Sequence, residues 1–195
     1  MAAAPSWKRK ACAGVVAAGL IVALGFLIHW YVINTRPPYV TVSLLGARGL
    51  DVDDRAGETP VEFDVAIGVL HLRSSLAVAH DSGQIAISYA GVKLAEGPVP
   101  KFYVAGGRAG WVEAARAVVP AAAADQAPLS QMFRDHIWVD QQMHGAAEFD
   151  VALRLFNVNI TTGQSFYSYH ACKAGLALDG EAKPSKCGLS TYFVR

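Results

Sequence analysis

No aspartate or glutamate occurs before Asp51, and one early stretch, Ala11–Ile33, also lacks lysine and arginine. As a helix, these roughly 23 residues would extend about 34 Å, enough to cross a hydrocarbon layer of roughly 30 Å. The sequence therefore predicts a transmembrane helix near its start. A second run of about 18 apolar residues is absent, because the nearest one, Ala114–Ala124, is interrupted by Arg116 and Pro120. This excludes a protein with several membrane-spanning helices.

Recognisable catalytic motifs are also missing. The chain contains no Gly-x-Ser-x-Gly, His-Glu-x-x-His, Walker or dinucleotide-binding pattern, and no Cys-x-x-Cys pair. The acidic stretch Asp51–Gly57 has Arg55 and Ala56 where a calcium-binding loop needs a ligand and a glycine. We therefore expect no enzymatic activity and no cofactor, and an extracytosolic hydrolase is only a remote alternative.

Three ligand-type side chains recur every fourth residue, at His136, Asp140 and His144. They would share one face of a helix, and a metal site needs two or three such groups that converge. Because Gly145 follows directly and the helix end is exposed, we interpret this face as solvated; a metal site is the alternative.

Basic residues gather directly before the apolar stretch. Lys8, Arg9 and Lys10 precede it, and only Arg36 closely follows it. This asymmetry predicts that the start of the chain lies in the cytosol and that the distal part lies outside or in a lumen. Subtracting the three bases from 17 leaves 14 against 16 acidic residues, so the remainder has a net charge of about −2. A nucleic-acid-binding domain would instead be basic.

The apolar stretch does not fit a cleavable signal peptide, whose apolar core has about 7–15 residues and is followed by small residues. Here the run is longer and ends in the bulky residues His29–Ile33. We therefore expect an uncleaved signal-anchor. Cys12, at its cytosolic boundary, is a candidate for palmitoylation, with an unmodified thiol as the alternative. Gly14 and Ala18 are small residues four apart, which would permit a homo-oligomer through close helix packing.

The chain divides into four expected segments. Proline cannot continue a helix, so Arg36-Pro37-Pro38 ends it and releases the distal domain. The segments are a cytosolic head (1–10), a transmembrane signal-anchor helix (11–33), a proline-containing exit linker (34–38) and an extracytosolic domain (39–195).

Alternation of apolar and polar residues in the distal domain predicts many short strands. A turn is expected at residues 81–83 (Asp-Ser-Gly), and Trp111–Val119 is ambiguous between strand and helix. Strands are expected within Tyr39–Leu44, Val61–Leu72, Leu76–His80, Ile85–Tyr89, Phe102–Val104, Phe149–Leu155 and Phe166–Tyr169, with edge strands near Leu176–Leu178 and Leu189–Val194.

One segment of the distal domain favours a helix. Apolar residues fall at helical spacing from Leu129 to about Gln142, with Ser130 able to cap the start and Gly145 closing the end. Many short strands and one helix predict a mainly β fold, namely a β-sandwich with one helical insertion.

Residues 76–107 carry a distinctive pattern. A short strand ends in Asp, an alternating strand ends in Tyr-x-Gly, and Leu-Ala-x-Gly and Pro-x-Phe-Tyr follow. The positions are Asp81, Tyr89, Gly91, Leu94, Ala95, Gly97, Pro100, Phe102 and Tyr103. With the basic head, the apolar stretch and the Arg-Pro-Pro exit, this pattern resembles plant harpin-induced-like and non-race-specific-disease-resistance-like membrane proteins. These proteins carry the late embryogenesis abundant group-two domain.

The resemblance implies a fibronectin- or immunoglobulin-like β-sandwich, a location at the plasma membrane or an endomembrane, and a role in plant defence or stress responses. It supplies no catalytic residues. The chain departs from the family pattern at His71-Leu72-Arg73, where an Asn-Pro-Asn turn would fall, and at Ala79-His80, where the family has an aromatic pair.

Two features depend on the compartment of the distal domain. In an oxidising lumen or extracellular space, Cys172 and Cys187 are candidates for a disulfide that closes a loop of about 16 residues; in the cytosol they would remain free. Asn159-Ile160-Thr161 is a complete N-glycosylation sequon. It would be used only outside the cytosol and only if Asn159 faces solvent.

The leading functional hypothesis is a non-catalytic, single-pass membrane protein that presents a β-sandwich to a protein, cell-wall or lipid partner in plant defence or stress response. The alternative is a structural or protective protein that acts on membranes during desiccation stress without a specific partner. A saturable partner would distinguish the first hypothesis from the second.

Overall fold

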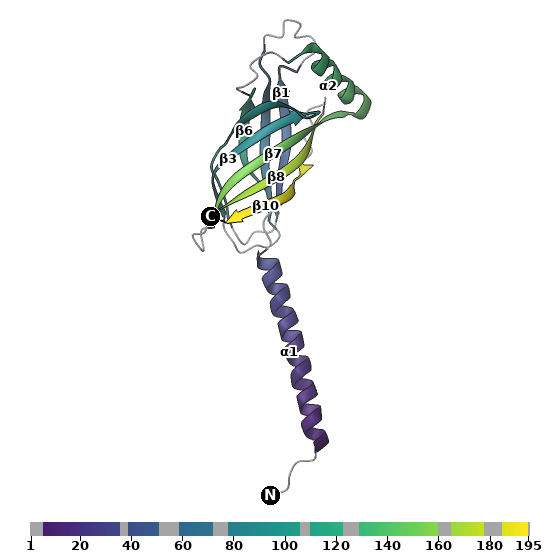
Figure 1. The fold of residues 1–195 in the computed structure, drawn as a ribbon, viewed down its shortest axis with the longest axis vertical. Coiled ribbons are helices and arrows are strands. Elements are labelled where there is room, and N and C mark those ends of the chain that lie inside the picture. Colours follow the sequence, from purple (N-terminus) through teal and green to yellow (C-terminus); the bar gives the residue numbers. More distant parts are fainter. Residues whose placement is uncertain are drawn as a thin grey trace. The chain divides into compact units, whose positions relative to one another are not determined.

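A computed structural model of the 195-residue chain describes residues 6–35, 39–50, 59–71, 78–105, 110–122, 129–159, 165–177 and 185–194. The chain divides into two compact units, Met1–Pro37 and Pro38–Arg195. The first unit contains one long helix, and the second is mainly β-structure with a hydrophobic core of its own (Figure 1).

The helix of the first unit, α1 (Ser6–Thr35), is continuous over 30 residues. Its described side chains are those of residues 16–31, and all of them are exposed. The large apolar ones among them are 55–73% exposed. Within the described part of the chain, no helix combines the length and apolarity expected of a membrane span.

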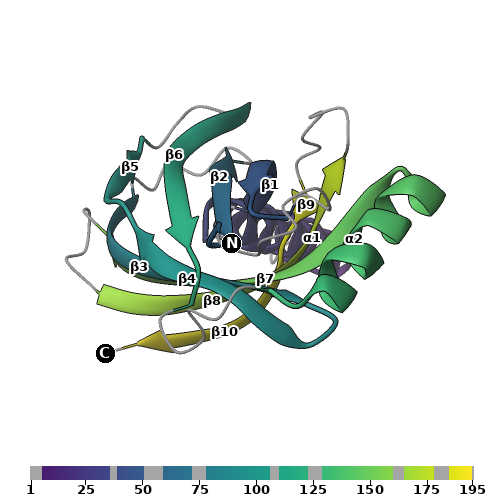
Figure 2. The same ribbon diagram turned by 90° about the horizontal axis from the view of Figure 1, so that it is seen from above.

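The second unit contains two antiparallel sheets, which form the two layers of a β-sandwich (Figure 2). Sheet A consists of β1 (Tyr39–Arg48), β2 (Glu62–His71), β6 (Gly110–Pro120) and β9 (Ser185–Lys186). Sheet B consists of β3 (Val78–Tyr89), β4 (Val92–Val99), β5 (Phe102–Val104), β7 (Ala146–Asn159), β8 (Ser165–Ala177) and β10 (Gly188–Val194).

The strand order is β6-β2-β1-β9 in sheet A and β10-β8-β7-β3-β4 in sheet B, with β5 paired to β3. The expected mainly β architecture is confirmed. Trp111–Val119, which the sequence left ambiguous, lies within the strand β6. The expected edge strand near Leu189–Val194 corresponds to β10 at one side of sheet B, whereas Leu176 belongs to β8.

The expected turn at residues 81–83 is wrong. β3 continues through these residues, and its pairing with β7 shifts register between His80 and Ser82. Such a bulge accommodates an extra residue and bends the strand without ending it. The chain reverses instead at Ala90 and Gly91, where φ is 49° and 81°. Positive φ at both positions is typical of the two-residue turn that joins a hairpin, here β3 and β4.

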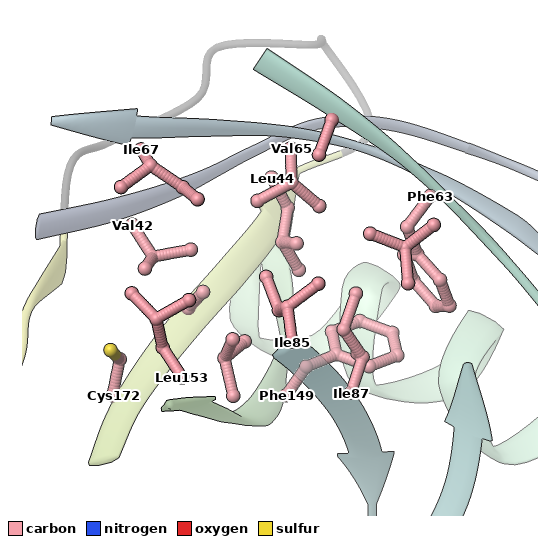
Figure 3. Close-up of a cluster of buried hydrophobic side chains, with 14 of the residues drawn as sticks. Val42, Leu44, Phe63, Val65, Ile67, Ile85, Ile87, Phe149, Leu153 and Cys172 are labelled. Carbon is pink, nitrogen blue, oxygen red and sulfur yellow. The ribbon is translucent and has the colours of Figure 1, made fainter. Parts of the chain in front are cut away.

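Alternate residues of the long strands point between the two sheets and form the core (Figure 3). Phe63 of β2 and Phe149 of β7 meet edge-on across the core, with ring centroids 5.4 Å apart. The ring of Tyr89 lies 5.4 Å from Phe149 on the same side. A fully buried side chain of this kind contributes about 1.5–3 kcal/mol to stability relative to an exposed one, so this alternation is the main source of the fold's stability.

One lateral edge of the sandwich is joined by backbone contacts between β4 and the residues that follow β6. Ala95 and Ala121 form an isolated β-bridge. The N–H of Ala122 donates to the carbonyl of Leu94 at 3.2 Å. The two sheets therefore meet at this edge through hydrogen bonds as well as through the core.

The other lateral edge is joined by the chain itself, which passes from β9 of sheet A into β10 of sheet B through Cys187. The N–H of Cys187 donates to the carbonyl of Val40 at 3.1 Å. Cys187 is bonded to Cys172 of β8, with the two sulfur atoms 1.97 Å apart. The crossing segment is therefore held to both sheets.

The helical insertion is α2 (Gln131–His144), which leads into β7 beside the sandwich (Figure 2). Ile137 and Arg134 are buried, and Gly145 ends the helix with φ 77°, a left-handed cap that favours glycine. Ser130 occupies the N-cap position as expected, but its side chain makes no capping hydrogen bond.

A hydrogen bond ties α2 to sheet B. The Tyr89 hydroxyl donates to Asp140 Oδ2 at 2.5 Å. Burial raises the pKa of Tyr89 to about 12, and the Asp140 carboxylate adds to this shift. The phenol therefore stays protonated, as a donor, at every pH at which proteins are usually studied.

Loss of the disulfide is expected to destabilise the second unit. The bond joins residues 15 positions apart, and the chain-entropy model assigns about 3 kcal/mol to a loop of this size. In urea denaturation followed by circular dichroism, the double variant Cys172→Ser/Cys187→Ser should lose about this much free energy of unfolding. Cys12→Ser is the control and should leave it unchanged. An unaltered midpoint in the double variant would contradict the expectation.

Tyr89→Phe should loosen α2. It removes a hydrogen bond to a carboxylate, which is worth about 1.5–3 kcal/mol when part-buried. The expected result is a lower free energy of unfolding and faster amide hydrogen exchange in α2 than in β7. Tyr103→Phe, at an exposed tyrosine of β5, is the matched control. Equal effects of the two substitutions would show that the Tyr89–Asp140 contact does not hold the helix.

Candidate functional site

The positions that carry the family resemblance form two groups. Tyr89, Leu94, Ala95, Gly97 and Phe102 are buried, whereas Asp81, Gly91, Pro100 and Tyr103 are exposed. Their contacts are mostly structural. Asp81, at the bulge of β3, accepts a hydrogen bond from Lys101 Nζ at 2.6 Å, and Phe102 stacks on His80 with ring centroids 4.1 Å apart. The pattern therefore consists mainly of residues that stabilise the strands. Tyr103, which is 59% exposed, is the one aromatic residue of the pattern whose ring is directed to solvent.

A row of polar side chains lies on the inner face of sheet B, where β3 begins and β7 ends. His80, Asn157, Ser168 and His170 are each no more than 5% exposed. Asn157 Nδ2 donates to Ser168 Oγ at 2.7 Å, and Ser168 Oγ lies 3.0 Å from His170 Nε2. Burial lowers the pKa of His170 to about 4, so its ring is neutral near pH 7.

This arrangement pairs a serine with a histidine, the two groups that nucleophilic catalysis uses. The Ser168 side chain is only 3% exposed, however, and its oxygen already accepts from Asn157. It is therefore inaccessible to a substrate in this arrangement, and the cluster acts as a buried hydrogen-bond network. We did not predict it, because the register that brings residues of three strands together is not readable from the sequence.

The three ligand-type side chains of α2 are not gathered into a metal centre. Asp140 is engaged by Tyr89, and His136 and His144 are exposed. Among the residues that the structure describes, no group of three or more His, Cys, Asp or Glu side chains is placed to hold a metal ion.

A hollow of about 410 Å³ lies on sheet A, beside the register shift between Leu44 and Gly46. It is lined by Gly46, Ala47, Arg48, Glu62, Asp64 and Val118. Arg48 and Glu62 are 3.6 Å apart as an exposed ion pair, and such pairs are weak and screened by salt. The hollow is thus lined by one ion pair, Arg48–Glu62, and by one further carboxylate, that of Asp64.

The outer face of sheet B carries a cluster of aromatic groups that reach solvent. Tyr167 and Tyr169 of β8 are 37% and 38% exposed. Phe156 of β7 lies beside Tyr167 with ring centroids 5.0 Å apart. The exposed Arg154 pairs in register with Tyr169. The sequence contains a signal for this face, because Arg154 and Phe156 alternate along β7 with the core residues Leu153 and Leu155.

Several predicted site residues lie outside the described side chains. These are the palmitoylation candidate Cys12 and the topology determinants Lys8, Arg9 and Lys10. Asn159 ends β7 without a described side chain, and the remainder of its sequon lies outside the described residues. The two candidate disulfide cysteines, Cys172 and Cys187, are bonded to each other.

No protein-family model matches the chain, and no curated protein matches its sequence. Among solved structures, the chain is compared with a protein from Archaeoglobus fulgidus whose crystal structure is known. The sequences are 15% identical, the match covers 62% of this chain and 89% of the archaeal chain, and the TM-score is 0.33. A likeness this low supports no functional argument.

The stability of the second unit should fall in mild acid because of His170. The pKa of His170 is about 4 in the folded state and 6.5 when unperturbed. Its neutral ring therefore contributes fully to the free energy of unfolding above pH 6.5, and this contribution is lost as the pH falls toward 4. The shift corresponds to at most roughly 3 kcal/mol. Urea midpoints of His170→Gln should vary less over this pH range than those of the natural protein. The exposed His136→Gln is the control, and an identical pH dependence in all three proteins would rule out the assignment to His170.

Proposed function

We propose that the chain is a single-pass membrane protein that displays a fibronectin- or immunoglobulin-like β-sandwich on the extracytosolic side and acts by binding, without catalysis. In this proposal the partner is a protein, a cell-wall component or a lipid. The role is in plant defence or stress response, as the resemblance of residues 76–107 to harpin-induced-like proteins implies.

The observation that carries the proposal is the apolar surface of α1. Every described side chain from residue 16 to residue 31 is exposed, including Phe26, Leu27 and Ile28. The apolar run in the sequence extends further on both sides, from Ala11 to Ile33. A continuous apolar surface of this kind is costly in water and is typical of membrane or protein contact. A bilayer would cover all sides of the helix at once.

Two further features support the extracytosolic placement of the second unit. Lys8, Arg9 and Lys10 precede the apolar run, which favours a cytosolic start. The Cys172–Cys187 disulfide is the kind of bond that persists in oxidising compartments and is rare in the cytosol. These two features are independent, because one lies in the sequence before α1 and the other in the second unit.

Topology can be tested in sealed microsomes with a tag at each end. We expect protease to remove the N-terminal tag and to leave the C-terminal tag intact, and alkaline carbonate to leave the protein in the pellet. Replacing Lys8, Arg9 and Lys10 by Asp should shift part of the population to the opposite orientation, because the positive-inside bias is lost. Arg36→Gln should not, since it removes charge only from the other side.

The redox state of the cysteines gives a second readout of the same proposal. In the natural orientation Cys172 and Cys187 should resist alkylation until a reductant is added, whereas molecules in the opposite orientation should be alkylated at once. A C-terminal tag that is digested in sealed vesicles, together with freely alkylated cysteines, would overturn the proposed topology.

A further inference from the structure

The outer face of sheet B carries a group of aromatic and basic side chains that reach solvent. We define the aromatic face as Phe156, Tyr167 and Tyr169 together with Arg154. It lies on β7 and β8, neighbouring strands in the middle of sheet B (Figure 1). Their inward-facing neighbours on the same strands are buried, so these four side chains are directed away from the core.

The register of the strands places the four side chains next to each other. Phe156 pairs with Tyr167, and Arg154 pairs with Tyr169. Directly paired residues of adjacent strands have their side chains on the same face. The rings of Phe156 and Tyr167 are tilted by 51° with centroids 5.0 Å apart. The face is therefore a compact block of three rings and one guanidinium group.

Small side chains border this block along the strands. The next row consists of Ala86 of β3, Ala152 of β7 and Ala171 of β8, which pair with one another across the sheet. Methyl groups project little above a sheet, so a ligand can lie flat over this row while it contacts the rings. Low side chains beside a row of rings leave the surface open along the strands, which suits an extended chain.

Arg154 differs in its ion pairing from the lysines of sheet B and its flanks. Lys173 is 2.6 Å from Glu148, Lys93 is 2.7 Å from Glu96, and Lys101 is 2.6 Å from Asp81. Within the described part of sheet B and its flanks, Arg154 is a basic residue with no carboxylate partner of its own. Its planar guanidinium is suited to a carboxylate supplied from outside, which it can bind through two parallel hydrogen bonds.

We propose that the aromatic face binds an acidic glycan, a chain of sugar rings that bear carboxylates. The apolar faces of the sugars would stack on Tyr167, Tyr169 and Phe156, and a uronate carboxylate would pair with Arg154. The hydroxyl of Tyr167 can supply a hydrogen bond to a sugar hydroxyl. The charge of Arg154 favours an acidic glycan over a neutral one. This inference rests on the proposed function, since such polymers are met outside the cytosol.

A fourth ring extends the same surface. Tyr103 of β5 pairs with Ala79, and Ala79 pairs with Val158, which lies two residues from Phe156 on β7. Tyr103 is therefore on the same face, two strand spacings or about 10 Å from β7. That separation is larger than one sugar ring, so oligomers should bind more tightly than single sugars.

The test uses the full-length protein in detergent micelles and oligomers of galacturonate as the probe, with oligomers of glucose as the neutral comparison. Calorimetry should show saturable binding to the acidic oligomers that weakens with added salt. Tyr167→Ala and Tyr169→Ala should each weaken it about tenfold, the effect expected from loss of one aromatic contact. Tyr167→Phe keeps the ring and should bind nearly as well as the natural protein.

Arg154→Gln should remove the preference for acidic over neutral oligomers. Tyr39→Ala and Arg48→Gln, exposed residues of sheet A, are the matched controls and should leave binding unchanged. An intact disulfide and an unchanged circular dichroism spectrum establish that each variant is folded.

The proposal is overturned if galacturonate oligomers do not bind, if the aromatic-face variants bind as the natural protein does, or if binding to glucose oligomers is equally tight and independent of Arg154. Capture of a protein or of lipid vesicles by the same face, without glycan binding, would also overturn it. The microsome experiment distinguishes failure of the proposed function from failure of this inference. A cytosolic second unit would contradict the proposed function. Failure of glycan binding in a correctly oriented protein would contradict this inference alone.

Discussion

Alternate side chains of the long strands meet between two sheets, and their burial is the constraint on which the other features of the domain depend. This burial brings the rings of Phe63 and Tyr89 into contact with the ring of Phe149. The same alternation forces the intervening residues outward, which is why Arg154 and Phe156 reach solvent while Leu153 and Leu155 do not. The surface available to a partner is thus set by the core.

Local patterns in the sequence predicted the elements whose signal is local. α2 follows from helical spacing closed by Gly145, and β2 and β7 follow from strict alternation around Phe63 and Phe149. Residues 81–83 were misinterpreted because Asp, Ser and Gly favour both turns and bulges. The neighbouring strand β7, which continues to pair beyond this point, decided between the two.

The surfaces were harder to predict because they depend on register between strands. The buried row at Ser168 and His170 and the aromatic face at Tyr167 and Tyr169 occupy alternating positions of one strand. Their residue types alone do not show which row faces the core. The inward row is polar and the outward row is aromatic, which is the reverse of the usual preference. Only the pairing of β8 with β7 shows which row faces the core. The family resemblance pointed to positions that mostly stabilise strands, with Tyr103 as the exception.

The course of β1 has a mechanical consequence. β1 is the first strand after the proline exit, and it lies inside sheet A, paired with β2 from Tyr39 to Arg48 and with β9 at Thr41 and Val42. Tension transmitted along the chain from its N-terminal side enters the domain through this strand. Hydrogen bonds along a strand that is pulled along its own axis share the load and yield together, rather than opening one after another as at a peeled edge. Cys187 donates a hydrogen bond to Val40 of this strand and is bonded to Cys172, so the start of β1 is also joined to sheet B.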